Sequence, residues 1–156
     1  MDSYELPDAI EPTYWNVVFH PSVTRLNRVL LGRFGHVSAF TYIPGFRAWI
    51  LYDCQWGGTR IGFCSGIGPL IVYSAGCAII KFDRRYERVA LSSRLGFYCV
   101  PAIKQLLGLS CVAATPDGLY RHLIRHGGEL ISGQRVATAT AAAGSDAAAG
   151  ATAGPG

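Results

Sequence analysis

The chain lacks the features that would indicate a nucleic-acid-binding protein, a metalloprotein or a disulfide-stabilised secreted domain. Only 15% of its 156 residues are charged, and 14 basic against 10 acidic side chains give a net charge of +4. This excess is small and dispersed, so it does not favour nucleic acid as a partner. The five cysteines include no C-x-x-C and no paired histidine spacing. We therefore expect reduced thiols in an intracellular protein, with no metal and no cofactor.

A signal peptide and a continuous membrane span are also missing from the sequence. Residues 1–12 (MDSYELPDAIEP) are acidic and have no apolar core, so we expect a flexible leader and not a signal peptide. Residues 61–80 carry no charge over a length that could cross a bilayer, but glycines and a proline interrupt them. We expect a loop there, then a short helical stretch near 69–75 and a buried strand near 77–83. The protein is therefore expected to be cytoplasmic, and membrane association is the weakest alternative.

What the sequence does contain is the apolar content of one folded domain. Half of the residues are hydrophobic, and a chain of this length can bury a sizeable core. We expect a single α+β domain over residues 13–132. Residues 133–156 are mostly Ala, Thr, Gly and Ser, which predicts a disordered tail because little apolar bulk is available for packing.

Local patterns predict an antiparallel sheet and three amphipathic helices within this domain. Strands are expected at 13–20, 36–42 and 47–53, and the last two form a hairpin around a loop at 43–46. Helices are expected at 22–35, 99–108 and 115–128, with an extended or looped segment at 87–97. The first helix has Ser22 as its N-cap and an apolar stripe, and the last has Thr115 as its N-cap. The members of that stripe are Val23, Leu26, Val29 and Leu30.

Cys99 begins the predicted helix at 99–108 and is the first candidate nucleophile. Pro101 supports this start, because proline is tolerated in the first turn of a helix. Unpaired amides and the macrodipole at a helix N-terminus favour negative charge, and so favour the thiolate form of a cysteine there. The alternative is a packed, unreactive thiol, since free cysteine is among the most buried residue types. For Cys99 taken alone, the packed thiol is the better interpretation.

His36 and Asp53 are predicted to face each other across the hairpin. With residues 43–46 as the loop and no bulge, Tyr42 lies opposite Arg47 and His36 falls opposite Asp53. Directly opposed residues share one face of a sheet, with Cβ atoms about 4.5–5.5 Å apart. A general base needs such a carboxylate, which fixes the tautomer of the imidazole and stabilises its cation. Alternatively, His36 is a solvated strand end and Asp53 begins a turn, and a one-residue register slip would separate the pair.

The remaining cysteines and histidines give weaker signals. Cys54 is a rival nucleophile beside Asp53, but it projects from the opposite face of its strand. Core or structural roles are expected for the others, which are His20, Cys64, Cys77, Cys111, His122 and His126. The last two have the i, i+4 spacing of metal ligands on a helix, but no third ligand accompanies them.

The order of these motifs along the chain resembles a known superfamily. FGHVSAF with its F-x-H pattern, WILYD, CVPAIKQLLGL and TPDGLYRHLIRHGG follow one another within residues 14–128. This pattern is similar to that of the circularly permuted papain-like (NlpC-type) cysteine hydrolases, which include the lecithin:retinol acyltransferase-like proteins. It is most similar to small members found in tailed-phage genomes. In the permuted proteins the histidine and its polar partner precede the nucleophile, whereas ordinary papain folds have the reverse order.

The resemblance implies an α+β fold in which an antiparallel sheet packs against the helix that bears the nucleophile. It assigns Cys99 as the nucleophile, His36 as the general base and Asp53 as the orienting residue of a catalytic triad. The backbone N–H of Cys99 would contribute to the oxyanion hole. Candidate side-chain oxyanion donors are Asn16, Gln55 and Tyr98.

The predicted function is that of a cysteine hydrolase, a peptidase or amidase that forms an acyl-enzyme thioester with a peptide or acyl substrate. Two alternatives stay open. One is an acyltransferase that uses the same triad, and the other is a non-catalytic phage structural or interaction protein with a papain-like scaffold. A phage-encoded protein of this kind would act on phage or host proteins in the cytoplasm of a bacterial host, or as part of the virion.

Overall fold

The computed structural model describes residues 14–55, 58–83 and 99–131, which form an α+β domain. Six strands make one antiparallel sheet in the order β4-β3-β2-β1-β5-β6. The strands are β1 (Tyr14–Pro21), β2 (Phe34–Ile43), β3 (Ala48–Gln55), β4 (Gly58–Cys64), β5 (Ala78–Asp83) and β6 (Glu129–Ile131). The helices are α1 (Arg25–Leu31), α2 (Gly68–Tyr73), α3 (Cys99–Leu107) and α4 (Pro116–Arg125), with a 3₁₀ turn at Pro44–Phe46. The predicted α+β class with an antiparallel sheet is confirmed.

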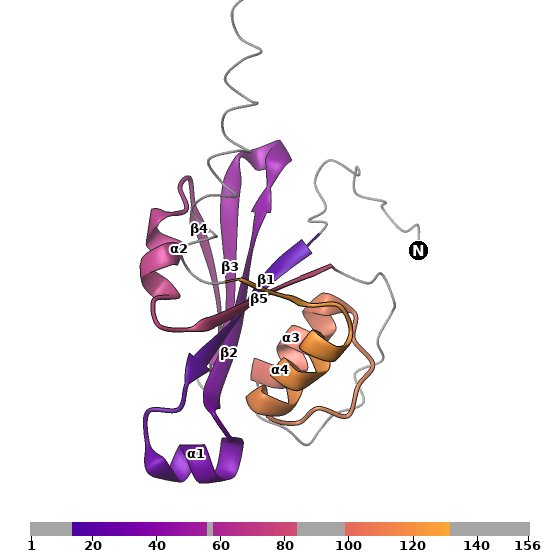
Figure 1. The fold of residues 1–156 in the computed structure, drawn as a ribbon. Coiled ribbons are helices and arrows are strands. Elements are labelled where there is room, and N and C mark those ends of the chain that lie inside the picture. The colour runs from indigo at the N-terminus through magenta and orange to yellow at the C-terminus, as the bar shows by residue number, and fades with distance from the viewer. Residues whose placement is uncertain (1–13, 56–57, 84–98, 132–156) are drawn as a thin grey trace, which may run out of the picture.

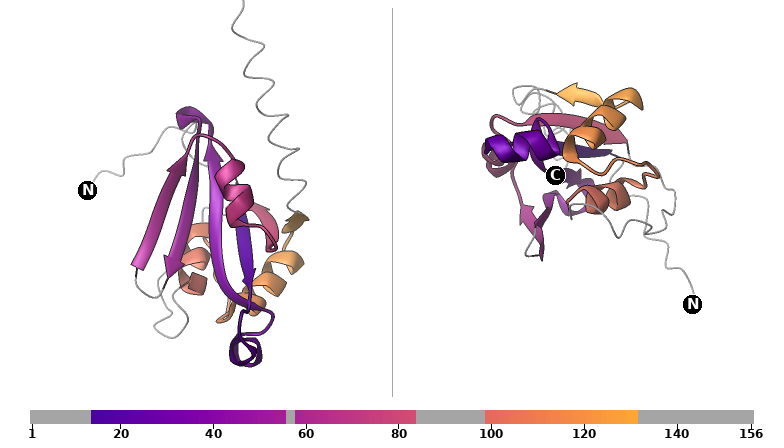
Figure 2. Two further views of the ribbon diagram at one scale, coloured as in Figure 1. Left: turned by 90° about the vertical axis from the view of Figure 1, so that its left-hand side faces the viewer. Right: turned by 90° about the horizontal axis from the view of Figure 1, so that it is seen from below.

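Helices cover the two faces of the sheet unequally (Figures 1 and 2). Helices α3 and α4 lie on one face, α2 lies on the other, and α1 lies beyond one end of β1 and β2. Side chains alternate along each strand, so β1 directs Val17 and Phe19 into the core beneath α3 and α4. It directs Val18 into a smaller core beneath α2, together with Phe40 and Leu70. The sheet is therefore buried on both faces at its centre.

Helix α1 is shorter than predicted, and its apolar stripe does not pack. Thr24, not Ser22, is the N-cap, and its side chain accepts a hydrogen bond from the Asn27 backbone N–H. Each residue of the predicted stripe is between 65% and 94% exposed, and only Leu31 of the helix is buried. The prediction of a core-facing stripe was wrong because α1 lies past the end of the strands, where no sheet surface is available to cover it.

Substitutions in α1 are expected to change the free energy of unfolding little at the exposed stripe and strongly at the buried Leu31. Val29→Ser should change the free energy of unfolding by about 0.5 kcal/mol or less, because the side chain is already in water. Leu31→Ala should cost about 2 kcal/mol or more, because it removes buried methyl groups and leaves a cavity. Urea unfolding of the two variants provides the measurement. A Val29→Ser cost equal to that of Leu31→Ala would contradict this placement of α1.

The charge-free segment at 61–80 forms three separate elements. Its first part is a strand and not the expected loop, because β4 pairs along its whole length with β3. The short helix and the strand that follow agree with the prediction, as α2 and β5. Among the described residues, no helix is long and apolar enough to cross a membrane.

The chain beyond the second core helix also follows local signals. Helix α3 ends before Gly108, which has the positive φ of 67° that glycine adopts readily. Thr115 caps α4 by accepting from the Gly118 backbone N–H, and Pro116 is the first helical residue, as predicted. Strand β6, which pairs with β5, was not predicted. The predictions for residues 1–12, 87–97 and 133–156 lie outside the described residues.

Candidate active site

The β2–β3 hairpin has a different register from the predicted one, but it keeps His36 and Asp53 on one face. The pairs run from Ile43 opposite Ala48 to Ala39 opposite Tyr52, so the unpaired segment is 44–47, one residue later in the chain than expected. The prediction that Asp53 lies directly opposite His36 was therefore wrong, since one further step places Asp53 opposite Ser38. The error of register is two positions. Because side chains alternate with a period of two, the shared face survives.

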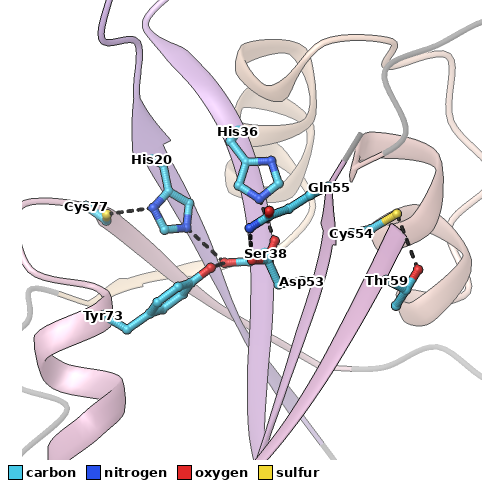
Figure 3. A network of polar contacts seen from close by, with 9 residues as sticks. All are labelled: His20, His36, Ser38, Asp53, Cys54, Gln55, Thr59, Tyr73 and Cys77. Carbon is cyan, nitrogen blue, oxygen red and sulfur yellow. Dashed lines mark hydrogen bonds and ion pairs between the residues drawn. The ribbon is translucent and has the colours of Figure 1, made fainter. Parts of the chain in front are cut away.

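The Asp53 carboxylate and the His36 ring are in direct contact (Figure 3). His36 Nε2 lies 2.6 Å from Asp53 Oδ1, and Gln55 Nε2 donates to Asp53 Oδ2 at 2.7 Å. Asp53 is 2% exposed. Burial alone would raise the pKa of this carboxyl, but hydrogen bonds from His36, Gln55 and Tyr73, with the charge on His36, lower it below its ordinary value. Asp53 is thus a buried carboxylate that stays ionised.

A β-bulge at the start of β2 sets the position of His36. His20 pairs with His36 but Pro21 pairs with Phe34, so Gly35 is the extra residue. Phe34 and Val37 both enter the core beneath α3 and α4, although they are separated by two residues. A bulge of this kind re-aims the side chains beside it. His36 can therefore contact Asp53 on the α2 side of the sheet and Cys99 on the α3 side.

Cys99 is the first residue of α3, in agreement with the sequence prediction. Cys99 is 6% exposed and belongs to the larger core, together with Val100, Ile103 and Leu107 of the same helix. Helix α3 packs against both β2 and β3, the strands that carry His36 and Asp53. The side chain of Cys99 lies close enough to His36 to raise the pKa of its ring. The three residues proposed from the sequence thus form one contact chain, Cys99–His36–Asp53.

The contacts of His36 favour its charged form. Burial by itself would lower the pKa of His36, but hydrogen bonds to Asp53 and Cys99, and their negative charges, raise it to about 9. At neutral pH the ring is therefore an imidazolium. In the neutral ring, an Nε2–H donated to Asp53 leaves Nδ1 with the lone pair that can take a proton from a thiol.

A second polar cluster on the same face was not predicted. His20 Nε2 lies 2.9 Å from Ser38 Oγ, and the Cys77 thiol lies 3.4 Å from His20 Nδ1. Tyr73 of α2 extends the cluster, with its hydroxyl 3.1 Å from Ser38 Oγ (Figure 3). The His20 and His36 rings are 5.3 Å apart between centroids. Burial, with the nearby charge on His36, lowers the pKa of His20 to about 4, so this second imidazole is neutral.

The candidate oxyanion donors separate into three cases. Gln55 reaches the site, but its amide is occupied in holding Asp53. Asn16 is buried on β1, four positions from His20, which is about 13 Å along a strand. The structure therefore does not bring Asn16 to His36. Tyr98 lies outside the described residues.

The remaining sequence candidates lie elsewhere or have structural contacts. Cys54 alternates with Asp53 and accepts a weak hydrogen bond from Thr59 at 3.7 Å, away from the His36 cluster (Figure 3). His122 and His126 stack with ring centroids 4.0 Å apart at the end of α4. In the part of the chain that the structure describes, no group of three His, Cys, Asp or Glu side chains is arranged to hold a metal ion.

The arrangement of thiol, imidazole and carboxylate is suited to nucleophilic acyl transfer. A thiol needs a base to remove its proton, and the base needs a group that orients it. Comparison of the chain with protein-family models, with curated proteins and with solved structures found no match. Function is therefore inferred from the contacts among these side chains.

Proposed function

We propose that the protein is a cysteine hydrolase in which Cys99 attacks an amide, ester or thioester carbonyl. His36 acts as the general base and acid, and Asp53 orients it. The position of His36, which is hydrogen-bonded to the Asp53 carboxylate and lies beside the Cys99 thiol, is the observation that carries the proposal. This constellation is recognised by geometry and roles, not by the order of residues in the chain.

The reaction follows from these contacts in two steps. In the first, the Cys99 sulfur forms a bond to the carbonyl carbon, and His36 delivers a proton to the departing amine, alcohol or thiol as its bond to that carbon breaks. A thioester and a neutral His36 remain. In the second, His36 removes a proton from water as the water oxygen attacks the thioester carbon. The carbon–sulfur bond then breaks, releasing the carboxylic acid and restoring the thiolate–imidazolium pair.

The start of α3 supplies an electrostatic contribution to the same reaction. The backbone N–H groups of the first helical turn have no partner within the helix. Cys99 is the first residue of α3, so its own N–H is one of these groups. Such donors stabilise the negative charge that develops on a carbonyl oxygen during attack. The backbone N–H of Cys99 is therefore our proposed oxyanion donor.

The finer fold assignment belongs to the same proposal. The general base and its orienting residue lie on adjacent strands early in the chain, and the nucleophile begins a later helix that packs on those strands. This order is that of a circularly permuted papain-like domain. A peptide or acyl substrate is the expected ligand class.

Labelling with acyl electrophiles tests the proposal. The intact protein, incubated with a panel of aryl esters, thioesters and peptide amides, should acquire one acyl group on Cys99, located by peptide mass spectrometry. The adduct should disappear from Cys99→Ala and persist in Cys111→Ala. Cys111 is partly exposed, and no hydrogen bond joins it to a histidine within the described residues. Equal acylation of Cys64, Cys111 and Cys99 in the folded protein would refute the nucleophile assignment.

Two alternatives differ from a hydrolase in measurable ways. An acyltransferase with the same triad would pass the Cys99 acyl group to an added amine or alcohol faster than to water. A non-catalytic interaction module is favoured by one observation, the exposed aliphatic side chains of α1, which are unusual on a free surface. This third role predicts that Cys99 is no more reactive than the other thiols.

A further inference from the structure

Polar side chains from three separate elements of the fold surround Asp53. His36 of β2 and Gln55 of β3 occupy its two oxygens at 2.6 and 2.7 Å. Tyr73 of α2 approaches from the side of the sheet away from α3 and α4. It helps to lower the pKa of Asp53, and its hydroxyl lies 3.1 Å from Ser38 Oγ. The first two side chains come from the hairpin itself. The third comes from a helix of the charge-free segment, to which the proposed function assigns no role.

Contacts of its ring and of helix α2 hold Tyr73 in place. Its ring makes an edge contact with His20, with centroids 5.2 Å apart. One turn earlier, Leu70 anchors α2 in the smaller core, and Ser74 closes the helix by donating to the Leu70 carbonyl at 2.8 Å. Burial and the neighbouring Asp53 raise the pKa of the Tyr73 phenol to about 12. The phenol therefore keeps its hydrogen at every pH at which the protein would work.

The polar groups behind Tyr73 form a continuous chain. A hydroxyl can both donate and accept, and its hydrogen rotates to suit its neighbours. With the Tyr73 hydrogen directed at Asp53, Ser38 can donate to the Tyr73 oxygen and accept from His20 Nε2–H. The remaining nitrogen of the neutral His20 ring then accepts from the Cys77 thiol. His20, Ser38 and Tyr73 then each have one donor and one acceptor in use within the chain, and all the hydrogens run toward the Asp53 carboxylate.

We propose that Tyr73 is a positioning residue of the active site, which fixes the Asp53 carboxylate through a hydrogen-bonded chain from Cys77 and His20 by way of Ser38. This inference rests on the proposed function, because Asp53 acts there through His36. The chain keeps the carboxylate ionised and oriented, and so keeps the His36 ring directed at Cys99. Helix α2 thus contributes to the site from the face opposite to the nucleophile.

The charged and titratable groups that surround Asp53 come from six elements. They are His20 on β1, His36 on β2, Arg60 on β4, Tyr73 on α2, Cys77 beside β5 and, through His36, Cys99 on α3. Arg60 pairs with Asp53 in the β3–β4 register, yet it is exposed and forms no ion pair with Asp53 among the described salt bridges. Removal of the Tyr73 hydroxyl changes none of the formal charges in this set.

The test compares Tyr73→Phe with Tyr42→Phe in the full-length protein. Tyr42 lies on the same face of the sheet and packs against Trp49, outside the chain of polar groups. Carbon-detected NMR titration of the Asp53 carboxyl should show its pKa rising in Tyr73→Phe, because a polar group that favours the anion is lost. Alkylation of Cys99 by iodoacetamide should also begin to fall at a higher pH than in the wild type, because His36 loses its ionised partner earlier. Both readouts should stay at their wild-type positions in Tyr42→Phe.

The outcomes distinguish this inference from the proposed function. An unmoved Asp53 titration in folded Tyr73→Phe overturns the inference, as does a Cys99 alkylation rate that falls equally at every pH, which a purely structural role would give. An unreactive Cys99 in the wild type, combined with a shifted Asp53 titration, defeats the hydrolase proposal and leaves the hydrogen-bonded chain intact. If Tyr73→Phe does not fold, Ser38→Ala, which removes the donor to the phenol, should shift the same titration in the same direction by a smaller amount.

Discussion

The His36→Ala substitution is expected to slow the alkylation of Cys99 by iodoacetamide at pH 6 by about a hundredfold or more. His36 holds its proton until pH reaches about 9, so it places a cation beside the sulfur throughout the neutral range. The thiolate is the nucleophile, and a neighbouring cation increases its population. Without that cation the rate should follow the titration of an ordinary thiol. Peptide-resolved mass spectrometry of the alkylated protein provides the rate for each cysteine.

The pH dependence makes this prediction sharper than the rate alone. In the wild type, the Cys99 rate should rise less steeply between pH 6 and 8 than in His36→Ala, because the His36 imidazolium favours the thiolate. His126→Ala is the matched control, because His126 lies at the end of α4 and its ring contacts groups of that helix. The rate at Cys111 serves as an internal standard. A wild-type Cys99 rate that climbs with pH as steeply as in His36→Ala would show that the pair does not form.

The prediction that His36 and Asp53 share one face of the sheet holds although the predicted hairpin register is wrong. The loop was assumed to hold residues 43–46, but Pro44–Phe46 forms a 3₁₀ turn that Arg47 closes in the left-handed conformation, with φ of 47°. Every pair therefore moved by two positions. A shift of two preserves the face, while a shift of one would have separated the two residues. The bulge at Gly35, which allows His36 to reach Cys99, leaves no comparable pattern in a single sequence.

The second cluster depends on contacts between distant parts of the chain. Cys77 and His20 are 57 positions apart and meet because β5 pairs with β1. Nothing in the local pattern of either strand specifies that pairing, so both residues were assigned structural or core roles. The pairing of β1 with β2 does indicate that His20 lies near the site. His20 alternates with Val18 and lies directly opposite His36 once β1 and β2 are paired, which puts the two rings on one face.

Periodicity failed where the helix has no surface to cover. The apolar spacing of Val23, Leu26, Val29 and Leu30 is typical of a buried stripe, and a similar spacing in α3 does mark the buried residues Val100, Ile103 and Leu107. The difference lies in position, because α3 crosses the sheet and α1 lies beyond its end (Figure 1). Amphipathic spacing shows which face a helix can bury, and the tertiary structure decides whether another element packs against that face.

The Asp53→Asn substitution is expected to destabilise the protein by about 2 kcal/mol at pH 6, with a loss that becomes smaller by pH 10. The folded state raises the pKa of His36 from 6.5 to about 9 through Asp53 and Cys99. A raised pKa stabilises the fold fully below pH 6.5, and this contribution disappears as the pH rises through about 9. The partial exposure of the ring, 28% for its side chain, reduces the free energy below the value that the shift alone implies.

The lowered pKa of Asp53 has the opposite pH dependence. Its contribution is present above the ordinary pKa of an aspartate and is lost only as the pH falls below that value, so both contributions are complete near pH 6. The neutral amide that Asp53→Asn introduces removes them together. Part of the loss should persist at pH 10, because one oxygen of the carboxylate is replaced by an amide nitrogen that faces other donors.

Urea unfolding at pH 6, 8 and 10 measures this difference, with Asp83→Asn as the matched control. Asp83 lies at the exposed end of β5, so its replacement should change the free energy of unfolding by about 0.5 kcal/mol or less at each pH. NMR titration of His36 in Asp53→Asn should show its pKa falling toward 6.5, the ordinary value for histidine. A difference in stability between wild type and Asp53→Asn that is the same at pH 6 and pH 10 would mean that the buried carboxylate is not what holds the proton on His36.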